Sequence, residues 1–247
     1  MRYARDHGVT LVAAVGNEST DLGHPMVDTT SPDYPQRGAA RTRTVDDSCL
    51  SCLTMPTEAD GVIVVSAVGP SRRLAYYSNY GVERTDVAAP GGDRREDFGT
   101  PYYNAPDKRV LAAYPRNVGV AAGTIDPATG NPTTPLVVKD TSGGVTAYWQ
   151  YLQGTSMAAP HAAGVAALVV SRYGHRDPVF GGLTLAPATV GRILRRTATR
   201  TPCPSVNPFV YDDPALADYH PFCAGTRSFN GFYGHGVVNA LRAVTGG

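Results

Sequence analysis

The segment at residues 154–164 constrains this chain more than any other. It reads Gly-Thr-Ser-Met-Ala-Ala-Pro-His-Ala-Ala-Gly and continues into a long apolar run. The residues from Ala162 to Val170 are apolar on nearly all sides of a helical projection, which predicts a helix buried in a domain core. Pro160 falls within the first turn of that helix, where its missing N–H group costs little. The pattern therefore places Ser156 at the start of a buried helix.

A serine at a helix start has two interpretations. The ordinary one is an N-cap, in which the hydroxyl accepts a hydrogen bond from the first turn. The other is a nucleophile, because the unpaired N–H groups and the positive end of the helix dipole are ready-made donors for an oxyanion. Most N-cap serines precede an amphipathic helix, so the apolar run after Ser156 favours the second interpretation.

The pattern Gly-Thr-Ser-Met-Ala-Ala-Pro-His-x-x-Gly resembles the nucleophile segment of the subtilisin-like serine peptidases, the subtilases. It differs from the nucleophile elbow of an α/β-hydrolase, which has glycine two residues after the serine, where this chain has Ala158. The resemblance implies a serine-type endopeptidase that cleaves polypeptides, with Ser156 as its nucleophile.

A second segment resembles the same family. Residues 9–15 form an apolar run of strand length that ends at Gly16-Asn17, which predicts a buried parallel strand followed by a loop. Alone, Gly-Asn after a strand is only a turn signal. The resemblance implies that the Asn17 side chain belongs to the oxyanion hole. It also implies that Ala14, Val15 and Gly16 line one wall of the pocket for the residue before the scissile bond.

Further segments continue the resemblance to the end of the chain. Residues 61–68 predict another buried strand, residues 77–81 and 86–91 resemble the family's next turn and strand, and residues 233–240 resemble the motif that leads into its last helix. Asn239 is placed as the N-cap of a last helix. We therefore expect an α/β fold, with a mainly parallel sheet and helices on both faces, that is incomplete on its N-terminal side. We expect residues 1–247 to be the C-terminal part of one such domain, with loop insertions near residues 19–60, 92–153 and 201–231.

The resemblance also implies residues that this chain does not contain. Subtilases order their triad as Asp, His, Ser, but no Asp-x-Gly or His-Gly-Thr segment precedes Asn17 here. Each histidine has an ordinary structural interpretation, and none is expected to act as the base: His7, His24, His161, His175, His220 and His235. In a member of this family, losing the histidine lowers turnover roughly 10⁶-fold, or roughly 8 kcal/mol.

Two expectations follow from the missing segments. In the first, an N-terminal half that carries the triad Asp and His is the partner of this chain, and the chain alone is a very poor protease. In the alternative, the chain is a truncated, non-catalytic remnant or half-domain with only a binding or structural role. An uncovered sheet edge would make the isolated chain marginally stable or insoluble.

Composition excludes several other classes. Charged residues make up 17% of the chain and the net charge is +1, so nothing indicates a nucleic-acid partner. The longest apolar stretch, around Ala162 to Val170, is too short to cross a bilayer. The charged first residues are not a signal peptide, so secretion is implied by the family and the cysteines rather than by this N-terminus.

The four cysteines are disulfide candidates. Cys203 and Cys223 bracket a proline-rich loop, and their pairing is the hypothesis that we favour. Cys49-x-x-Cys52 has the spacing of half a zinc site, but no second pair with that spacing accompanies it, so we expect no metal there. The partner of Cys49 stays open. No cofactor is expected; calcium is common among subtilases, but no ligand cluster is identified in this sequence.

Overall fold

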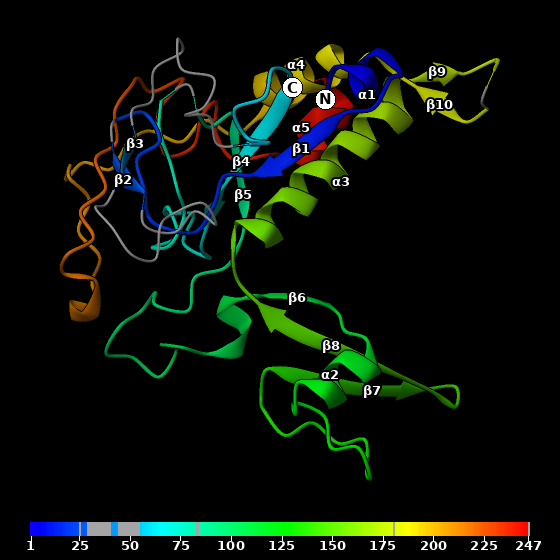
Figure 1. Ribbon diagram of the computed structural model, residues 1–247, viewed down its shortest axis with the longest axis vertical. Coiled ribbons are helices and arrows are strands. Elements are labelled where there is room, and N and C mark those ends of the chain that lie inside the picture. The colour runs from blue at the N-terminus through cyan, green and yellow to red at the C-terminus, as the bar shows by residue number, and fades with distance from the viewer. Residues whose placement is uncertain (25, 29–40, 44–54, 83, 180, 247) are drawn as a thin grey trace.

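The computed structural model describes residues 1–247 except 25, 29–40, 44–54, 83, 180 and 247 (Figure 1). In chain order, its helices, 3₁₀ helices (η) and strands are α1 (Arg2–Asp6), β1 (Leu11–Ala14), β2 (Met26–Asp28), β3 (Arg41–Arg43), β4 (Val62–Val68), β5 (Val87–Pro90), η2 (Pro106–Lys108), β6 (Val110–Ala113), α2 (Arg116–Ala121), β7 (Val137–Ser142), β8 (Val145–Leu152), α3 (Thr155–Tyr173), β9 (His175–Arg176), β10 (Leu183–Thr184), α4 (Pro187–Thr197), η3 (Pro214–Leu216) and α5 (Ala240–Thr245).

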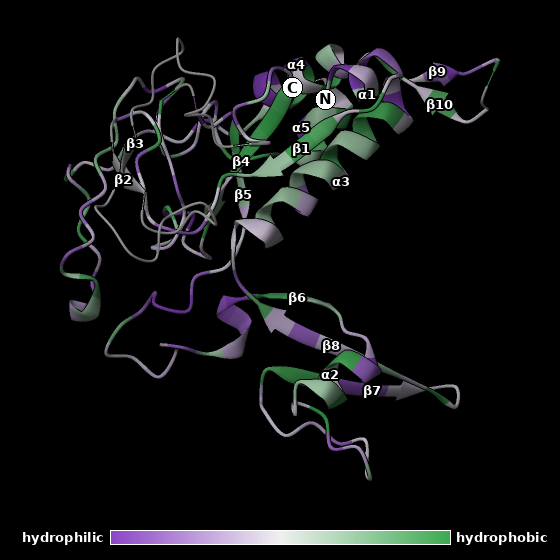
Figure 2. Ribbon diagram, viewed as in Figure 1, coloured by the Kyte–Doolittle hydropathy of each residue, from purple (hydrophilic) through white to green (hydrophobic). Residues whose placement is uncertain are grey.

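The centre of the fold is a parallel sheet in the order β1-β4-β5. Leu11 is paired with Val62, and Val65 is paired with Val87. All seven residues of β4 are buried, as expected for a run of Val, Ile and Ala in a parallel strand that is covered on both faces. Figure 2 shows β1 and β4 in the hydrophobic colour. The strands predicted at residues 9–15, 61–68 and 86–91 are therefore confirmed.

Helix α3 packs on this sheet and contacts all three strands. Its buried side chains share one apolar cluster with Ile63 and Val65 of β4, and α4 and α5 contribute to the same cluster. The opposite face of the sheet packs against loop residues, among them Leu22 and Ala59. The predicted α/β fold with a parallel sheet is confirmed, while α3, α4 and α5 all share one face within the part of the chain that the structure describes.

One side of α3 differs from the prediction. The sequence predicts a helix buried on all sides, but a stripe of apolar residues on α3 is exposed: Pro160, Ala163, Gly164, Ala167 and Leu168. Leu168 alone is 47% exposed. The reason is that no other described element packs on this stripe. In the same described part, β1 is the last strand of its sheet and its outer edge is unpaired.

Residues 92–153 contain a second sheet rather than loops alone. Strands β6, β8 and β7 form an antiparallel sheet that lies apart from the parallel one and joins it at the start of α3 (Figure 1). Its core is Ile125, Val137 and Tyr148. The hairpin between β7 and β8 turns at Gly143 and Gly144, whose φ angles of 57° and 78° suit a two-residue turn. The stretch therefore has regular structure of its own, because alternating β-branched and aromatic residues around Gly-Gly specify a hairpin, and its being an insertion stays a prediction.

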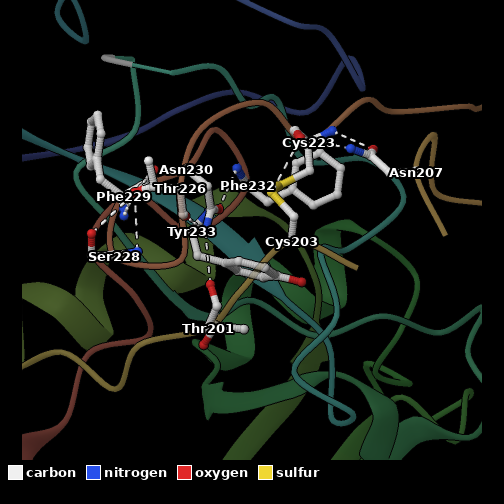
Figure 3. The surroundings of a disulfide bond; sticks show 10 residues. All are labelled: Thr201, Cys203, Asn207, Cys223, Thr226, Ser228, Phe229, Asn230, Phe232 and Tyr233. Carbon is white, nitrogen blue, oxygen red and sulfur yellow. Dashed lines mark hydrogen bonds between the residues drawn. A yellow bond between two sulfur atoms is a disulfide. The ribbon is translucent and has the colours of Figure 1, made fainter. Parts of the chain in front are cut away.

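Residues 201–231 are held together by a disulfide. The sulfur atoms of Cys203 and Cys223 lie 2.06 Å apart (Figure 3). Asn207 braces the same loop, since its side chain donates to Cys223 O and accepts from Cys223 N, both at 2.9 Å. This stretch contains η3 as its helical element. Cys49 and Cys52, and most of the insertion expected at residues 19–60, lie outside the described residues.

Among the described helices, none combines the length and the apolar character needed to cross a membrane.

Candidate active site

Ser156 lies in the first turn of α3 and is exposed. The N-cap of this helix is Gly154, so the interpretation of Ser156 as an N-cap is wrong. The N–H groups of Met157 and Ala158 donate to Gly154 O at 2.9 and 3.3 Å. The Ser156 N–H group has no acceptor among the described residues, as expected for a donor in the first turn of a helix. It is therefore available to a ligand.

Asn17 reaches the same helix start from the end of β1. Its Oδ1 accepts hydrogen bonds from the Thr155 backbone N–H at 2.9 Å and from the Thr155 hydroxyl at 3.0 Å. The Thr155 hydroxyl in turn lies 3.3 Å from Gly16 N, which donates to it. The carbonyl side of the Asn17 amide is thus committed to Thr155, and its NH₂ group is left for another partner.

Gly154 lies between the Asn17 amide and the Ser156 N–H group. Its φ is 149°, within the region that favours glycine. A Cβ atom placed on it would lie 3.6 Å from Asn17 Oδ1 and 3.7 Å from Ser156 N. The Asn17 amide oxygen and the Ser156 N–H group therefore border one small space beside the Gly154 Cα. The absence of a side chain keeps that space open.

The three residues predicted to line a pocket wall differ in burial. Ala14 and Gly16 are half-buried beside the Asn17 loop. The Val15 side chain is 1% exposed and belongs to the apolar cluster with Leu22. Only the backbone of Val15 can therefore contribute to a wall.

A brace between β5 and α3 holds the Ser156 segment, and the sequence did not indicate it. Gly154 N donates to Gly91 O at 3.0 Å. The Tyr77 hydroxyl lies within hydrogen-bond distance of Gly91 O and Gly92 O, at 2.9 and 2.6 Å. Burial raises the pKa of Tyr77, which keeps this hydroxyl protonated and able to donate. Residues 77–81 were identified only as a family-like turn, and no sequence pattern marks Tyr77 as a brace.

No base is hydrogen-bonded to Ser156 in the part of the chain that the structure describes. His161 is exposed, and its Nδ1 is paired with Met157 O at 2.8 Å, one turn back along α3. His7 is paired with Tyr3 O and His24 with Asp21. Burial lowers the pKa of His235, whose ring packs against Phe229. Each of these four histidines therefore has a contact other than Ser156, and His235 is half-buried rather than on a solvated surface.

Within the described residues, no group of three or more His, Cys, Asp or Glu side chains is placed to hold a metal ion.

Comparison with known proteins identifies the family. The family model described as "Subtilase family" matches residues 1–236. The chain belongs to the subtilase family. A curated relative of this subtilase chain is an extracellular basic protease of Dichelobacter nodosus, which is 32% identical over 147 residues. That match covers 60% of the subtilase chain and 17% of the relative.

Solved structures share the fold. A protease of Pseudoalteromonas arctica is 25% identical, with a TM-score of 0.51 over 99% of this subtilase chain and 44% of that protein. A lanthipeptide protease is 21% identical, with a TM-score of 0.56 over 100% of this chain and 54% of that protein. The subtilase chain thus spans about half the length of these solved proteins, and less of the curated relative.

Proposed function

We propose that this chain carries the nucleophile and the oxyanion donors of a subtilisin-like serine endopeptidase. One observation carries the proposal. Thr155 holds the Asn17 amide by its oxygen, so the Asn17 NH₂ group and the Ser156 N–H group are both donors without an acceptor among the described residues, at the same helix start. Two preorganised donors beside an exposed serine hydroxyl are suited to stabilising an oxyanion.

The proposed reaction is peptide hydrolysis in two steps. Ser156 Oγ attacks the carbonyl carbon of the scissile bond, its proton passes to a base, and the carbonyl oxygen becomes an oxyanion bound by Asn17 Nδ2 and Ser156 N–H. Collapse of the intermediate breaks the C–N bond, and the base returns the proton to the leaving amine. Water then hydrolyses the acyl-enzyme by the same route, which restores the serine.

The base and its carboxylate partner are proposed to come from polypeptide outside these 247 residues. Two features support this. The exposed apolar stripe on α3 continues along the helix from Ser156, and the outer edge of β1 is unpaired within the described residues. Surfaces of this kind are normally covered.

Polypeptide substrates follow from the same proposal. Secretion is proposed as well, supported by the extracellular relative and by the disulfide between Cys203 and Cys223.

A fluorophosphonate probe tests the proposal, because it labels an activated serine and not an ordinary hydroxyl. Two samples are labelled: the protein as its source organism produces it, and the 247-residue chain produced alone. We expect labelling of the source-produced protein at Ser156, located by peptide mapping, and its loss in Ser156→Ala. We expect labelling of the chain alone to be slower by several orders of magnitude, since the oxyanion donors remain but the base does not.

The controls separate the two candidate functions. Ser205→Ala removes an exposed loop serine and is expected to leave labelling unchanged. If the source-produced protein is not labelled at Ser156, the endopeptidase proposal fails and the non-catalytic alternative stands. If Ser156→Ala is still labelled at the same rate, another nucleophile is responsible.

A further inference from the structure

Asn79 lies in the turn between β4 and β5, and its side chain is directed into the loop that carries Asn17. Asn79 is 5% exposed. Its Oδ1 accepts from the backbone N–H groups of Glu18 and Thr20, both at 2.9 Å. Its Nδ2 donates to Glu18 Oε2 at 2.6 Å and to Val15 O at 3.3 Å. A buried amide that makes all four of these bonds to one short loop fixes the shape of that loop.

The loop needs such a template because its backbone is unusual. Gly16 has a φ of 112° and Ser19 has a φ of 53°. A non-glycine residue with positive φ persists only when its surroundings hold it there. A Cβ atom on Gly16 would overlap the Asn79 amide, so glycine is what allows this side chain to approach the backbone. Asn79 N also donates to Gly16 O at 3.0 Å.

The connection continues from Asn79 to Asn17 through one carboxylate. Glu18 Oε2, which accepts from Asn79 Nδ2, also accepts from the Asn17 backbone N–H at 2.9 Å. The backbone of Asn17 is therefore held by Glu18, and its side chain is held by Thr155. Fixing both ends sets the direction of the Asn17 NH₂ group.

We infer that Asn79 is a positioning residue for Asn17 and acts through Glu18, an inference that rests on the proposed function. Asn79 itself is buried and does not touch substrate. Asn79 aligns the oxyanion donor, so its replacement is expected to lower kcat, which reports the chemical step, more than it changes KM.

The test is peptidase activity of the source-produced protein with a chromogenic peptide. Asn17→Ala is expected to lower kcat about 10²–10³-fold, the usual cost of one oxyanion donor. Asn79→Ala is expected to lower kcat by a smaller factor, on the order of tenfold, with little change in KM. Because Asn79 acts through Asn17, the double variant is expected to be no slower than Asn17→Ala alone. If the two losses multiply instead, Asn79 does not act through Asn17 and the inference is overturned.

Asn230 provides a matched control. It is 1% exposed, its Oδ1 accepts from Phe232 N and Tyr233 N at 3.2 and 3.1 Å, and its Nδ2 donates to Thr201 O at 2.9 Å (Figure 3). Its hydrogen bonds join residue 201 to residues 230–233, and none of them reaches the Asn17 loop. Asn230→Ala is expected to lower thermal stability about as much as Asn79→Ala and to leave kcat unchanged. Equal kcat losses in both variants would mean that destabilisation alone explains the effect.

A rescue pair separates positioning from packing. Asn79→Asp keeps acceptors for Glu18 N and Thr20 N but places a second carboxylate against Glu18 Oε2. Adding Glu18→Gln removes the repulsion between the two carboxylates and supplies an NH₂ group that can donate to the Asp side chain, although the acceptor for Asn17 N at the Oε2 position is then lost. The double variant is expected to recover part of the kcat lost in Asn79→Asp. A double variant that is slower than Asn79→Asp contradicts the proposed connection.

A structural readout keeps the inference testable apart from activity. Hydrogen exchange of the Glu18 and Thr20 amides is expected to accelerate in Asn79→Ala and not in Asn230→Ala. If the wild-type protein proves inert, the proposed function fails, and this exchange still decides whether Asn79 holds the loop. Unchanged exchange in Asn79→Ala overturns the inference whatever the activity.

Discussion

At the scale of single residues, Asp93 is a carboxylate buried just beyond β5. Its side chain is 2% exposed, and burial raises the pKa of the Asp93 carboxyl to about 6, although it accepts from Arg95 N and Tyr76 N. Because this pKa lies above the unfolded value of 3.8, the folded state binds the proton more tightly. The stability that protonated Asp93 contributes is fully present below pH 3.8 and is lost as the pH rises to about 6.

Asp93→Asn is therefore expected to remove this pH dependence. The free energy of unfolding of the variant, minus that of the wild type, is expected to rise by up to about 3 kcal/mol between pH 3.5 and pH 7. Urea unfolding across that range measures it. Asp126→Asn is the control of opposite sign, because hydrogen bonds from Thr129 lower the pKa of Asp126. For this variant, the free energy of unfolding minus that of the wild type is expected to fall as the pH rises. A flat difference for Asp93→Asn contradicts the prediction.

At the scale of elements, the N-cap glycine of α3, Gly154, and the glycine inside the helix, Gly164, have opposite requirements. Gly154 has a φ of 149° and faces the space between Asn17 and Ser156, whereas a Cβ on Gly164 would meet no atom within 4 Å. Gly154→Ala is expected to slow fluorophosphonate labelling of the source-produced protein about 10²-fold, since the strain of a Cβ atom at this positive φ falls on the Ser156 turn. Gly164→Ala, in the helix interior, is expected to add up to about 1 kcal/mol to the stability of the 247-residue chain alone. Unchanged labelling of Gly154→Ala would show that the Gly154 space is not used.

The elements also show what the sequence can and cannot specify. The buried strands and the start of α3 were predictable, because apolar runs and a helix start are encoded in consecutive residues. The β7–β8 hairpin was missed although Gly143-Gly144 marks it. The role of Asn79 was not predictable, since its hydrogen bonds to Glu18 and Thr20 cross 61 and 59 positions of sequence. Only the folded chain brings that side chain to the loop.

At the scale of the whole molecule, the parts of the proposed site come from distant segments that the parallel sheet aligns. Asn17 follows β1, the Tyr77 brace follows β4, and Ser156 begins the helix that packs across both strands. The order of the segments was predictable from resemblance to subtilases. The sequence could not predict whether α3 is covered on all sides. An apolar helix has the same sequence pattern whether the polypeptide that covers it belongs to these 247 residues or to another segment.

The exposed stripe on α3 leads to a prediction for the 247-residue chain produced alone. Leu168 is 47% exposed on that stripe, and β1 has an unpaired edge within the described residues. Surfaces of both kinds favour self-association, so we expect the chain to elute as oligomers in size-exclusion chromatography with light scattering. Leu168→Glu is expected to shift the population toward monomer. Leu241→Glu, which changes a 70% exposed leucine on α5, is expected to leave it unchanged. A monomeric wild-type chain with one cooperative thermal transition would mean that the stripe tolerates water and that no covering polypeptide is needed for folding.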